Sequence, residues 1–86
     1  MPLFRKKPIV IEAIQWMGDN WTELLHFVKE KSEGVYTANA DKSLLIHTLE
    51  VNDRAGISDW IIKGVKGEFY ACKADIFKLT YEKVEE

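Results

Sequence analysis

The stretch that decides the fold is residues 57–73, Ile-Ser-Asp-Trp-Ile-Ile-Lys-Gly-Val-Lys-Gly-Glu-Phe-Tyr-Ala-Cys-Lys. Two apolar, β-prone runs, Trp60–Ile62 and Phe69–Ala71, flank a segment with glycines at positions 64 and 67. Glycine permits the positive φ that a tight reversal requires. The stretch therefore predicts a β-hairpin with Lys63 and Lys66 at its tip.

An amphipathic helix is predicted from about residue 20 to residue 32. Asn20 suits the N-cap, and Glu23 stands where a capping box places its reciprocal acceptor. Gly34 can end the helix. An apolar stripe follows the spacing i, i+3, i+4, i+7 and consists of Trp21, Leu24, Leu25 and Val28.

The other segments alternate or break in ways typical of strands and loops. In chain order we expect a strand over 8–16, a short strand over 35–38, a strand over 44–51, a loop over 52–56, one helical turn over 74–78, and either a strand (preferred) or a continued helix over 79–84. The prediction is an α+β fold: a small antiparallel, twisted sheet of about five strands with one amphipathic helix packed on it.

The 86 residues predict a single domain, 1–86, with 47% hydrophobic residues, 30% charged residues and a net charge of −2. Proteins that bind nucleic acid regardless of sequence normally present a broad basic face, so this class is not expected. A chain of this size buries only about 60–65% of its unfolded surface. Without disulfides or a metal motif to add stability, it is expected to form a homo-oligomer.

A cytoplasmic location is expected. The single cysteine, Cys72, cannot form an internal disulfide and suits a reducing cytosol. The apolar run that follows the basic residues 5–7 ends at Glu12 after three residues, too short for a signal peptide or a membrane span. No membrane association is predicted.

The sequence does not predict an enzyme. No spacing of cysteine and histidine suggests a metal, and there is no phosphate loop, dinucleotide fingerprint or nucleophile elbow, so neither metal nor cofactor is expected. Only the fold could pair Cys72 with His47, and Cys72 is interpreted as a small buried hydrophobic residue. Gly64-Val65-Lys66-Gly67 matches the Gly-x-x-Gly of backbone-clamping modules, but the turn alone explains the two glycines.

Three basic segments each lie near an aromatic residue, a conjunction that suits an anionic, ring-bearing ligand such as a nucleotide. In this hypothesis the cations contact phosphate and an aromatic ring stacks on the base. The alternative is a solvated turn whose aromatic residues belong to the core. The candidate ligand-binding residues are Arg5, Trp16, His47, Trp60, Lys63, Lys66 and Tyr70.

Two passages resemble a widespread family of small phage and prophage proteins: Phe4–Trp16, and Ile46–Glu50 followed after a gap by Ser58–Tyr70. The family core is Gly-Asp-(Trp/Tyr)-Ile-(Ile/Val), Lys-Gly, Gly-Glu-Phe-Tyr, Cys-Lys and a Phe…Tyr-Glu tail. This chain departs from that pattern at Ser58, where the family has glycine, and at Ala71 and Ala74, where proline is common.

The resemblance implies a setting, the cytoplasm of an infected bacterium, in which small phage proteins often counter host defence. It leads to the hypothesis of an oligomer that sequesters a nucleotide second messenger of bacterial immunity without catalysis. Two alternatives stand beside it: an inhibitor that binds a host protein, and an accessory structural protein with no ligand.

Overall fold

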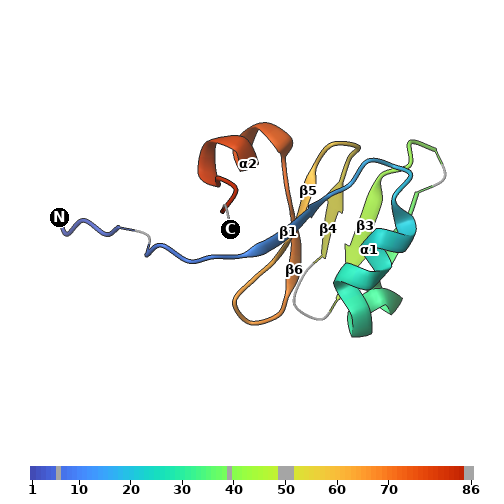
Figure 1. Ribbon diagram of the computed structural model, residues 1–86, viewed down its shortest axis with the longest axis horizontal. Helices are drawn as coiled ribbons and strands as arrows, with labels where there is room; N and C mark the ends of the chain where they lie inside the picture. The colour runs from blue at the N-terminus through green and yellow to red at the C-terminus, as the bar shows by residue number, and fades with distance from the viewer. Residues whose placement is uncertain (6, 39, 49–51, 85–86) are drawn as a thin grey trace.

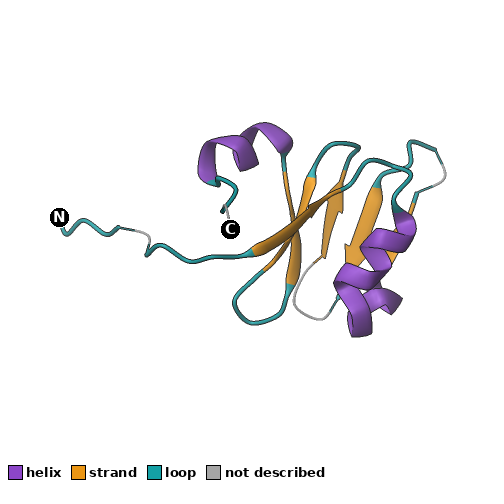
Figure 2. Cartoon of the chain, in the orientation of Figure 1, coloured by secondary structure: helices purple, strands orange, loops and turns teal. Residues whose placement is uncertain are grey.

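The computed structural model describes residues 1–5, 7–38, 40–48 and 52–84 and combines helices with two antiparallel sheets (Figure 1, Figure 2). This confirms the α+β class, but the strands of the described residues form two three-stranded sheets, and the same residues contain two α-helices. The element order is β1 (Glu12–Gln15), α1 (Trp21–Val28), the 3-10 helix η1 (Lys29–Gly34), β2 (Val35–Thr37), β3 (Leu44–His47), β4 (Asn52–Ala55), β5 (Trp60–Lys63), β6 (Phe69–Cys72) and α2 (Ala74–Thr80).

The first sheet has the order β1-β5-β6 and contains the predicted hairpin. Strand β5 pairs antiparallel with β6, with Lys63 opposite Phe69, and on its other side with β1, with Lys63 opposite Glu12. Side chains alternate between the two faces of a strand. Lys63, Phe69 and Glu12 therefore share one face, while Trp60 lies on the other.

The second sheet has the order β2-β3-β4. The strand expected over 35–38 is confirmed as β2, and β3 occupies the first half of the strand expected over 44–51, whose last residues, 49–51, lie outside the described residues. The loop expected over 52–56 was wrong, because Asn52–Ala55 forms β4 and pairs with β3.

Long-range contacts explain why the polar strand β4 forms. Ala55 is fully buried at its end, and the Asp53 carboxylate accepts a hydrogen bond of 2.9 Å from the backbone N–H of Ala71 on β6. This bond ties the second sheet to the first. Neither contact produces an alternating apolar pattern in the sequence, which is why a loop was predicted over 52–56.

The core lies between α1 and both sheets. Leu24 and Val28 are the buried residues of α1, whereas Trp21 is only partly buried against the core. The sheets contribute Ile14, Val35, Leu44, Ile46, Ala55, Ile61 and Phe69 to the same cluster. Trp16, just after β1, is 1% exposed and completes it.

Helix α1 is shorter than predicted and is capped differently. It ends at Val28, and the chain continues as η1. Asn20 makes no side-chain bond to the helix; its Oδ1 accepts a hydrogen bond from the N–H of Met17, and its Nδ2 donates to the carbonyl of Gln15. The predicted capping box was wrong because Asn20 instead holds the loop that precedes the helix.

The C-terminal segment also differs from the prediction. Helix α2 runs over Ala74–Thr80, beyond the single turn expected, and residues 81–84 form no strand. The ring of Phe77 stacks on Trp60 of β5, with centroids 4.1 Å apart and planes 7° apart. This contact holds α2 over the face of the first sheet opposite Lys63.

Asp59 anchors the start of α2. Its buried carboxylate accepts hydrogen bonds from the N–H of Gly56 (2.9 Å), the N–H of Ala74 (3.2 Å) and the ammonium of Lys73 (3.1 Å). One side chain thus fixes both the turn before β5 and the first residue of the helix after β6. No local sequence pattern predicts this long-range cap.

Replacing Asp59 by alanine is expected to lower the free energy of unfolding by about 2–3 kcal/mol, because two backbone N–H groups and an ammonium lose their acceptor. Urea unfolding at pH 7 measures the loss. The matched control is Asp75→Ala, which removes an exposed carboxylate that accepts a hydrogen bond from the N–H of its neighbour Ile76. Equal losses in the two variants would contradict the assigned role of Asp59.

The stabilisation that Asp59 contributes should depend on pH. Burial alone would raise the pKa of Asp59, but the hydrogen bonds from Gly56, Lys73 and Ala74 outweigh burial and lower that pKa below 3.8. The folded pKa is therefore below the unfolded one, so the stabilisation is complete above the unfolded value and is lost as the pH falls through the folded value. The difference between wild type and Asp59→Ala should be constant down to about pH 4 and shrink below it.

The strand predicted over 8–16 is confined to Glu12–Gln15, and the chain before it forms an extended N-terminal arm, residues 1–5 and 7–11 (Figure 1). None of the described strands pairs with the arm. It lengthens the molecule to 46 Å, against 28 and 27 Å along the other axes. Among the described residues, no helix has the length and apolar character needed to cross a bilayer.

Candidate functional site

Two adjoining hollows, of about 240 and 350 Å³, lie between the end of α1 and the first sheet. We call them together the α1–hairpin groove. Phe27, Lys29 and Lys63 line both hollows. The first hollow is completed by Val28, Lys66, Gly67 and Phe69, and the second by Glu12, Ala13, Ile14, Glu23 and His26.

Two aromatic rings form the apolar wall of the groove. Phe27 comes from α1 and Phe69 from β6, and their centroids are 5.4 Å apart with planes at 68°. This edge-to-face packing is a favourable geometry for an aromatic pair. Phe69 is buried, while Phe27 is only partly buried, so Phe27 offers ring surface to a ligand.

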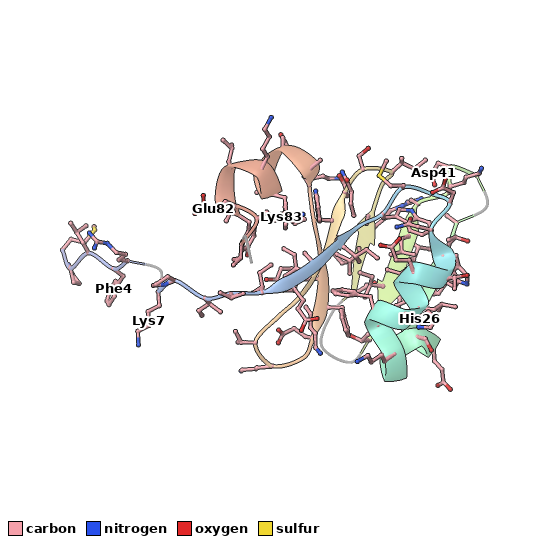
Figure 3. All side chains as sticks on the ribbon, viewed as in Figure 1. Phe4, Lys7, His26, Asp41, Glu82 and Lys83 are labelled. Carbon is pink, nitrogen blue, oxygen red and sulfur yellow. The ribbon has the colours of Figure 1, made fainter. Side chains whose placement is uncertain are left out.

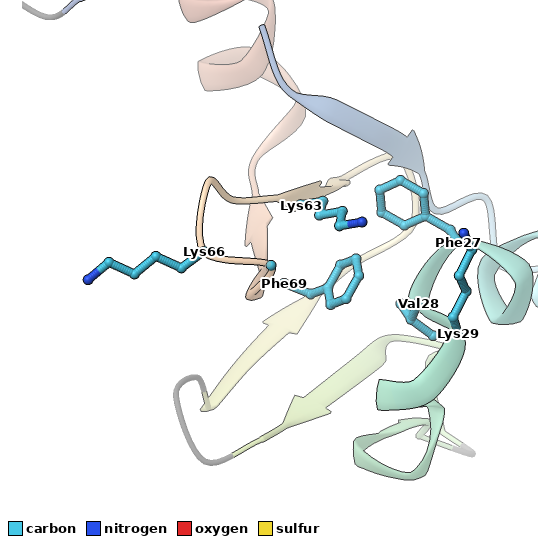
Figure 4. A pocket seen from close by; sticks show the side chains of 7 residues that line it. Phe27, Val28, Lys29, Lys63, Lys66 and Phe69 are labelled. Atoms are coloured by element: carbon cyan, nitrogen blue, oxygen red, sulfur yellow. The ribbon is translucent and has the colours of Figure 1, made fainter. Parts of the chain in front are cut away.

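Lys63 and Lys29 bring positive charge to this wall from two elements. In Figure 4 the Lys63 side chain extends from the hairpin toward Phe27, while Lys29 extends beside Phe27 from the end of α1. Lys66 also lines the first hollow, but its side chain points away from the groove in this view. Cations beside an aromatic ring suit a ligand with both negative charge and a ring.

The backbone at Lys29 places that side chain. Lys29 is the C-cap of α1 and has φ +50° and ψ −115°, a sparsely populated backbone conformation that costs a residue with a side chain about 1–3 kcal/mol. Its N–H bonds to the carbonyl of Leu25, which closes the last turn. A lysine here also interacts favourably with the negative end of the helix dipole.

The second hollow also carries carboxylates. Glu12 of β1 and Glu23 of α1 line it together with His26, which is exposed. Carboxylates accept hydrogen bonds and cannot donate them. Lys29 and Lys63 line this hollow as well, and Lys63 stands directly opposite Glu12, so the groove offers cations that suit phosphate and, beside them, carboxylates that suit the amino group of a base.

The glycines of the hairpin tip serve the turn. Gly67 has φ +82°, its N–H donates to the carbonyl of Gly64 (3.0 Å), and the N–H of Gly64 donates to the carbonyl of Glu68 (2.7 Å). A Cβ on Gly64 would collide with the Glu68 side chain. Both glycine amides are thus engaged within the turn and are not displayed as a backbone clamp for phosphate.

The structure does not bring the seven predicted site residues together. Lys63 and Lys66 line the groove, whereas Arg5 is exposed on the arm. His47 lies in the second sheet, where its ring stacks on Tyr36 with centroids 5.4 Å apart. Trp16 is in the core, and its Nε1 donates to the carbonyl of Lys42.

Trp60 and Tyr70 lie on the face of the first sheet away from the groove. One ring face of Trp60 is covered by Phe77. Tyr70 stands opposite Ile62 on that same face, and burial, followed by a hydrogen bond with Tyr81, raises the pKa of Tyr70. The aromatic residues that accompany Lys63 are instead Phe27 and Phe69.

Cys72 lies apart from the groove and is half-buried, less enclosed than expected. Burial, then the nearby carboxylates of Asp59 and Asp75, raise its pKa, so the thiol stays protonated at neutral pH. His47 belongs to the other sheet. Among the described residues, no group of three or more histidine, cysteine, aspartate or glutamate side chains could hold a metal ion.

No protein-family model, curated protein sequence or solved structure matches this chain. What the groove can bind is therefore inferred from its own side chains.

Proposed function

We propose that the α1–hairpin groove binds a nucleotide and holds it without converting it. The observation that carries this proposal is that Lys29 and Lys63 line the same hollow as the Phe27–Phe69 ring pair (Figure 4). Two ammonium groups supply charge-assisted hydrogen bonds to phosphate oxygens. The exposed surface of the Phe27 ring supplies an apolar contact for the base or sugar.

Charged side chains of both signs recognise the ligand. The phosphate contacts Lys29 and Lys63, and the carboxylates of Glu12 and Glu23, which line the second hollow beside the same two lysines, accept hydrogen bonds from an exocyclic amino group of the base. A base with such a group, adenine, guanine or cytosine, is favoured over uracil. The two hollows of about 240 and 350 Å³ together match the size of sites for small ligands, about 300–1,000 Å³.

Sequestration is the role that best suits a binding groove in the setting that the sequence resemblance implies. A phage protein that captures a nucleotide immune signal needs affinity but no reacting groups. It would act in the cytoplasm of the infected host, at a concentration comparable with that of the signal. The function proposed is therefore that of an anti-defence protein that depletes a nucleotide second messenger.

Thermal unfolding with a panel of cyclic mono-, di- and trinucleotides tests the proposal. A ligand at about 100 times its dissociation constant stabilises the folded state by about 2.7 kcal/mol. For a domain of this size, that stabilisation should raise the Tm by about 10–20 °C. At least one nucleotide with an exocyclic amino group should produce this rise, and its nucleoside, lacking phosphate, should not. A flat response to every nucleotide would contradict the proposal.

A further inference from the structure

The hydrogen bonds between β1 and β5 fix the direction in which each backbone N–H of β1 points. In an antiparallel pair, alternate residues bond to the partner strand, and the residues between them face the other way. The N–H of Trp16, just after β1, donates to the carbonyl of Asp59 (2.8 Å) and continues the register of the pair. Ile14 and Glu12 are therefore bonded to β5 as well. The N–H and C=O of Ala13 point away from β5, toward the free edge of β1.

A side-chain hydrogen bond agrees with this alternation and closes part of the free edge. Gln15 should face the same way as Ala13, and its C=O accepts a hydrogen bond of 2.8 Å from Nδ2 of Asn20. Asn20 directly precedes α1, which lies over the groove face of the sheet (Figure 3). The edge of β1 is thus occupied at Gln15 and opens at Ala13.

Ala13 contributes its backbone to the second hollow of the α1–hairpin groove. It lines that hollow together with Glu12 and Ile14, although its side chain lies on the opposite face of the sheet from theirs. Beside the carboxylates of Glu12 and Glu23, the hollow therefore contains one backbone donor and one backbone acceptor that no strand of the described residues uses. A neighbouring donor and acceptor on a flat ring is the pattern that the edge of a nucleobase presents.

We propose that the backbone of Ala13 recognises the base of the bound nucleotide. Its N–H donates to an acceptor on the edge of the base, and its C=O accepts from the neighbouring donor, while Lys29 and Lys63 hold the phosphate. Because Asn20 already bonds to Gln15, an added peptide strand would be cut short here, whereas a base needs only the one donor and one acceptor of Ala13. The inference rests on the proposed nucleotide site and adds the group that recognises the base.

Amide hydrogen exchange of the unmodified full chain, followed residue by residue by NMR, tests this inference. In the free protein the N–H of Ala13 should exchange about tenfold or more faster than that of Ile14, which is bonded to β5. The probe is the cyclic nucleotide that raises the Tm most. At about ten times its dissociation constant it should slow the exchange of Ala13 about tenfold. Ribose 5-phosphate, which carries a phosphate but no base, should leave that exchange unchanged.

Ala13→Pro removes the N–H that the base would use. Proline is tolerated in an edge strand where the N–H faces out of the sheet, so the variant should keep the ladder with β5. It should weaken binding of the nucleotide about tenfold and leave binding of ribose 5-phosphate unchanged. Ala13→Val is the matched control, because it keeps the N–H and adds its methyl groups on the face away from the groove. Far-UV circular dichroism checks that both variants are folded.

Three results would overturn the role of Ala13 while leaving the nucleotide site standing. They are a bound nucleotide that does not slow the exchange of Ala13, equal slowing by ribose 5-phosphate, and wild-type affinity in Ala13→Pro. Slow exchange of Ala13 without nucleotide, increasing with protein concentration, would also overturn it and place a second copy on this edge. If no nucleotide of the panel binds, both proposals fail. The exchange measurement decides the question even if Ala13→Pro does not fold.

Discussion

Replacing Trp16 by alanine is expected to lower the free energy of unfolding by about 3–5 kcal/mol, the usual cost of truncating a buried tryptophan. Its side chain is 1% exposed and packs edge-to-face on Trp21, with centroids 6.3 Å apart. The ring nitrogen also donates to the carbonyl of Lys42, which would lose its partner. For a domain of 86 residues, whose whole stability is about 4–13 kcal/mol, this is a large fraction.

Trp21→Ala is the matched control. Trp21 is the other ring of the same pair but is only half-buried, so its loss should cost about 1–2 kcal/mol. Urea unfolding followed by far-UV circular dichroism measures both variants without relying on tryptophan fluorescence. Equal losses, or a loss below about 1 kcal/mol for Trp16→Ala, would show that Trp16 is not the centre of the core.

The sequence predicted the elements whose signals are local. The apolar stripe located α1, and the paired glycines between two apolar runs located the β5–β6 hairpin. Elements that depend on distant partners were missed or shortened. Strand β4 forms because Ala55 is buried and Asp53 bonds to Ala71, and α2 begins where Asp59 accepts the N–H of Ala74.

Ser58 has a positive φ, which its residue type does not predict. It has φ +82°, a backbone conformation in which a serine is strained, and it stands where the family resembled by this chain has glycine. Its N–H donates to the carbonyl of Trp16 (2.7 Å), and its own carbonyl accepts from the Gln15 side chain. These bonds hold the residue in place despite the strain.

The sequence predicted part of the candidate site. The alternation of side chains between the two faces of a strand explains why the other predicted residues lie elsewhere. Trp60 and Lys63 are three residues apart on one strand, so their side chains must lie on opposite faces. The same alternation on β6 places Phe69, and not Tyr70, beside Lys63. This alternation could have identified Phe69 as a site residue from the hairpin sequence alone. Lys29 could not be found that way, because its place depends on where α1 ends and on how α1 packs.

Removing the two lysines that line both hollows of the groove with Lys29→Ala/Lys63→Ala is expected to weaken nucleotide binding about 100-fold or more. A charge-assisted contact to phosphate contributes about 1.5–3 kcal/mol, and each 1.4 kcal/mol corresponds to about tenfold in affinity. The Tm of the unliganded protein should change little, because Lys29 is exposed and Lys63 is half-exposed. Lys66→Ala should have a smaller effect, since its side chain points away from the groove (Figure 4).

Lys78→Ala/Lys83→Ala is the matched control for this variant. It removes the same total charge from exposed lysines of α2 and of the tail that follows it. Helix α2 covers the face of the first sheet opposite the groove, through the stack of Phe77 on Trp60. If long-range attraction alone drew nucleotides to the protein, both double variants would weaken binding equally and salt would abolish the effect.

Titration calorimetry of the nucleotide that gives the largest rise in Tm, with wild type and the two double variants side by side, tests the central claim most directly. The α1–hairpin groove is the binding site if Lys29→Ala/Lys63→Ala loses about two orders of magnitude in affinity while Lys78→Ala/Lys83→Ala binds like wild type. Wild-type affinity in Lys29→Ala/Lys63→Ala, with the protein still folded, would contradict the assignment and leave the hairpin as only a turn.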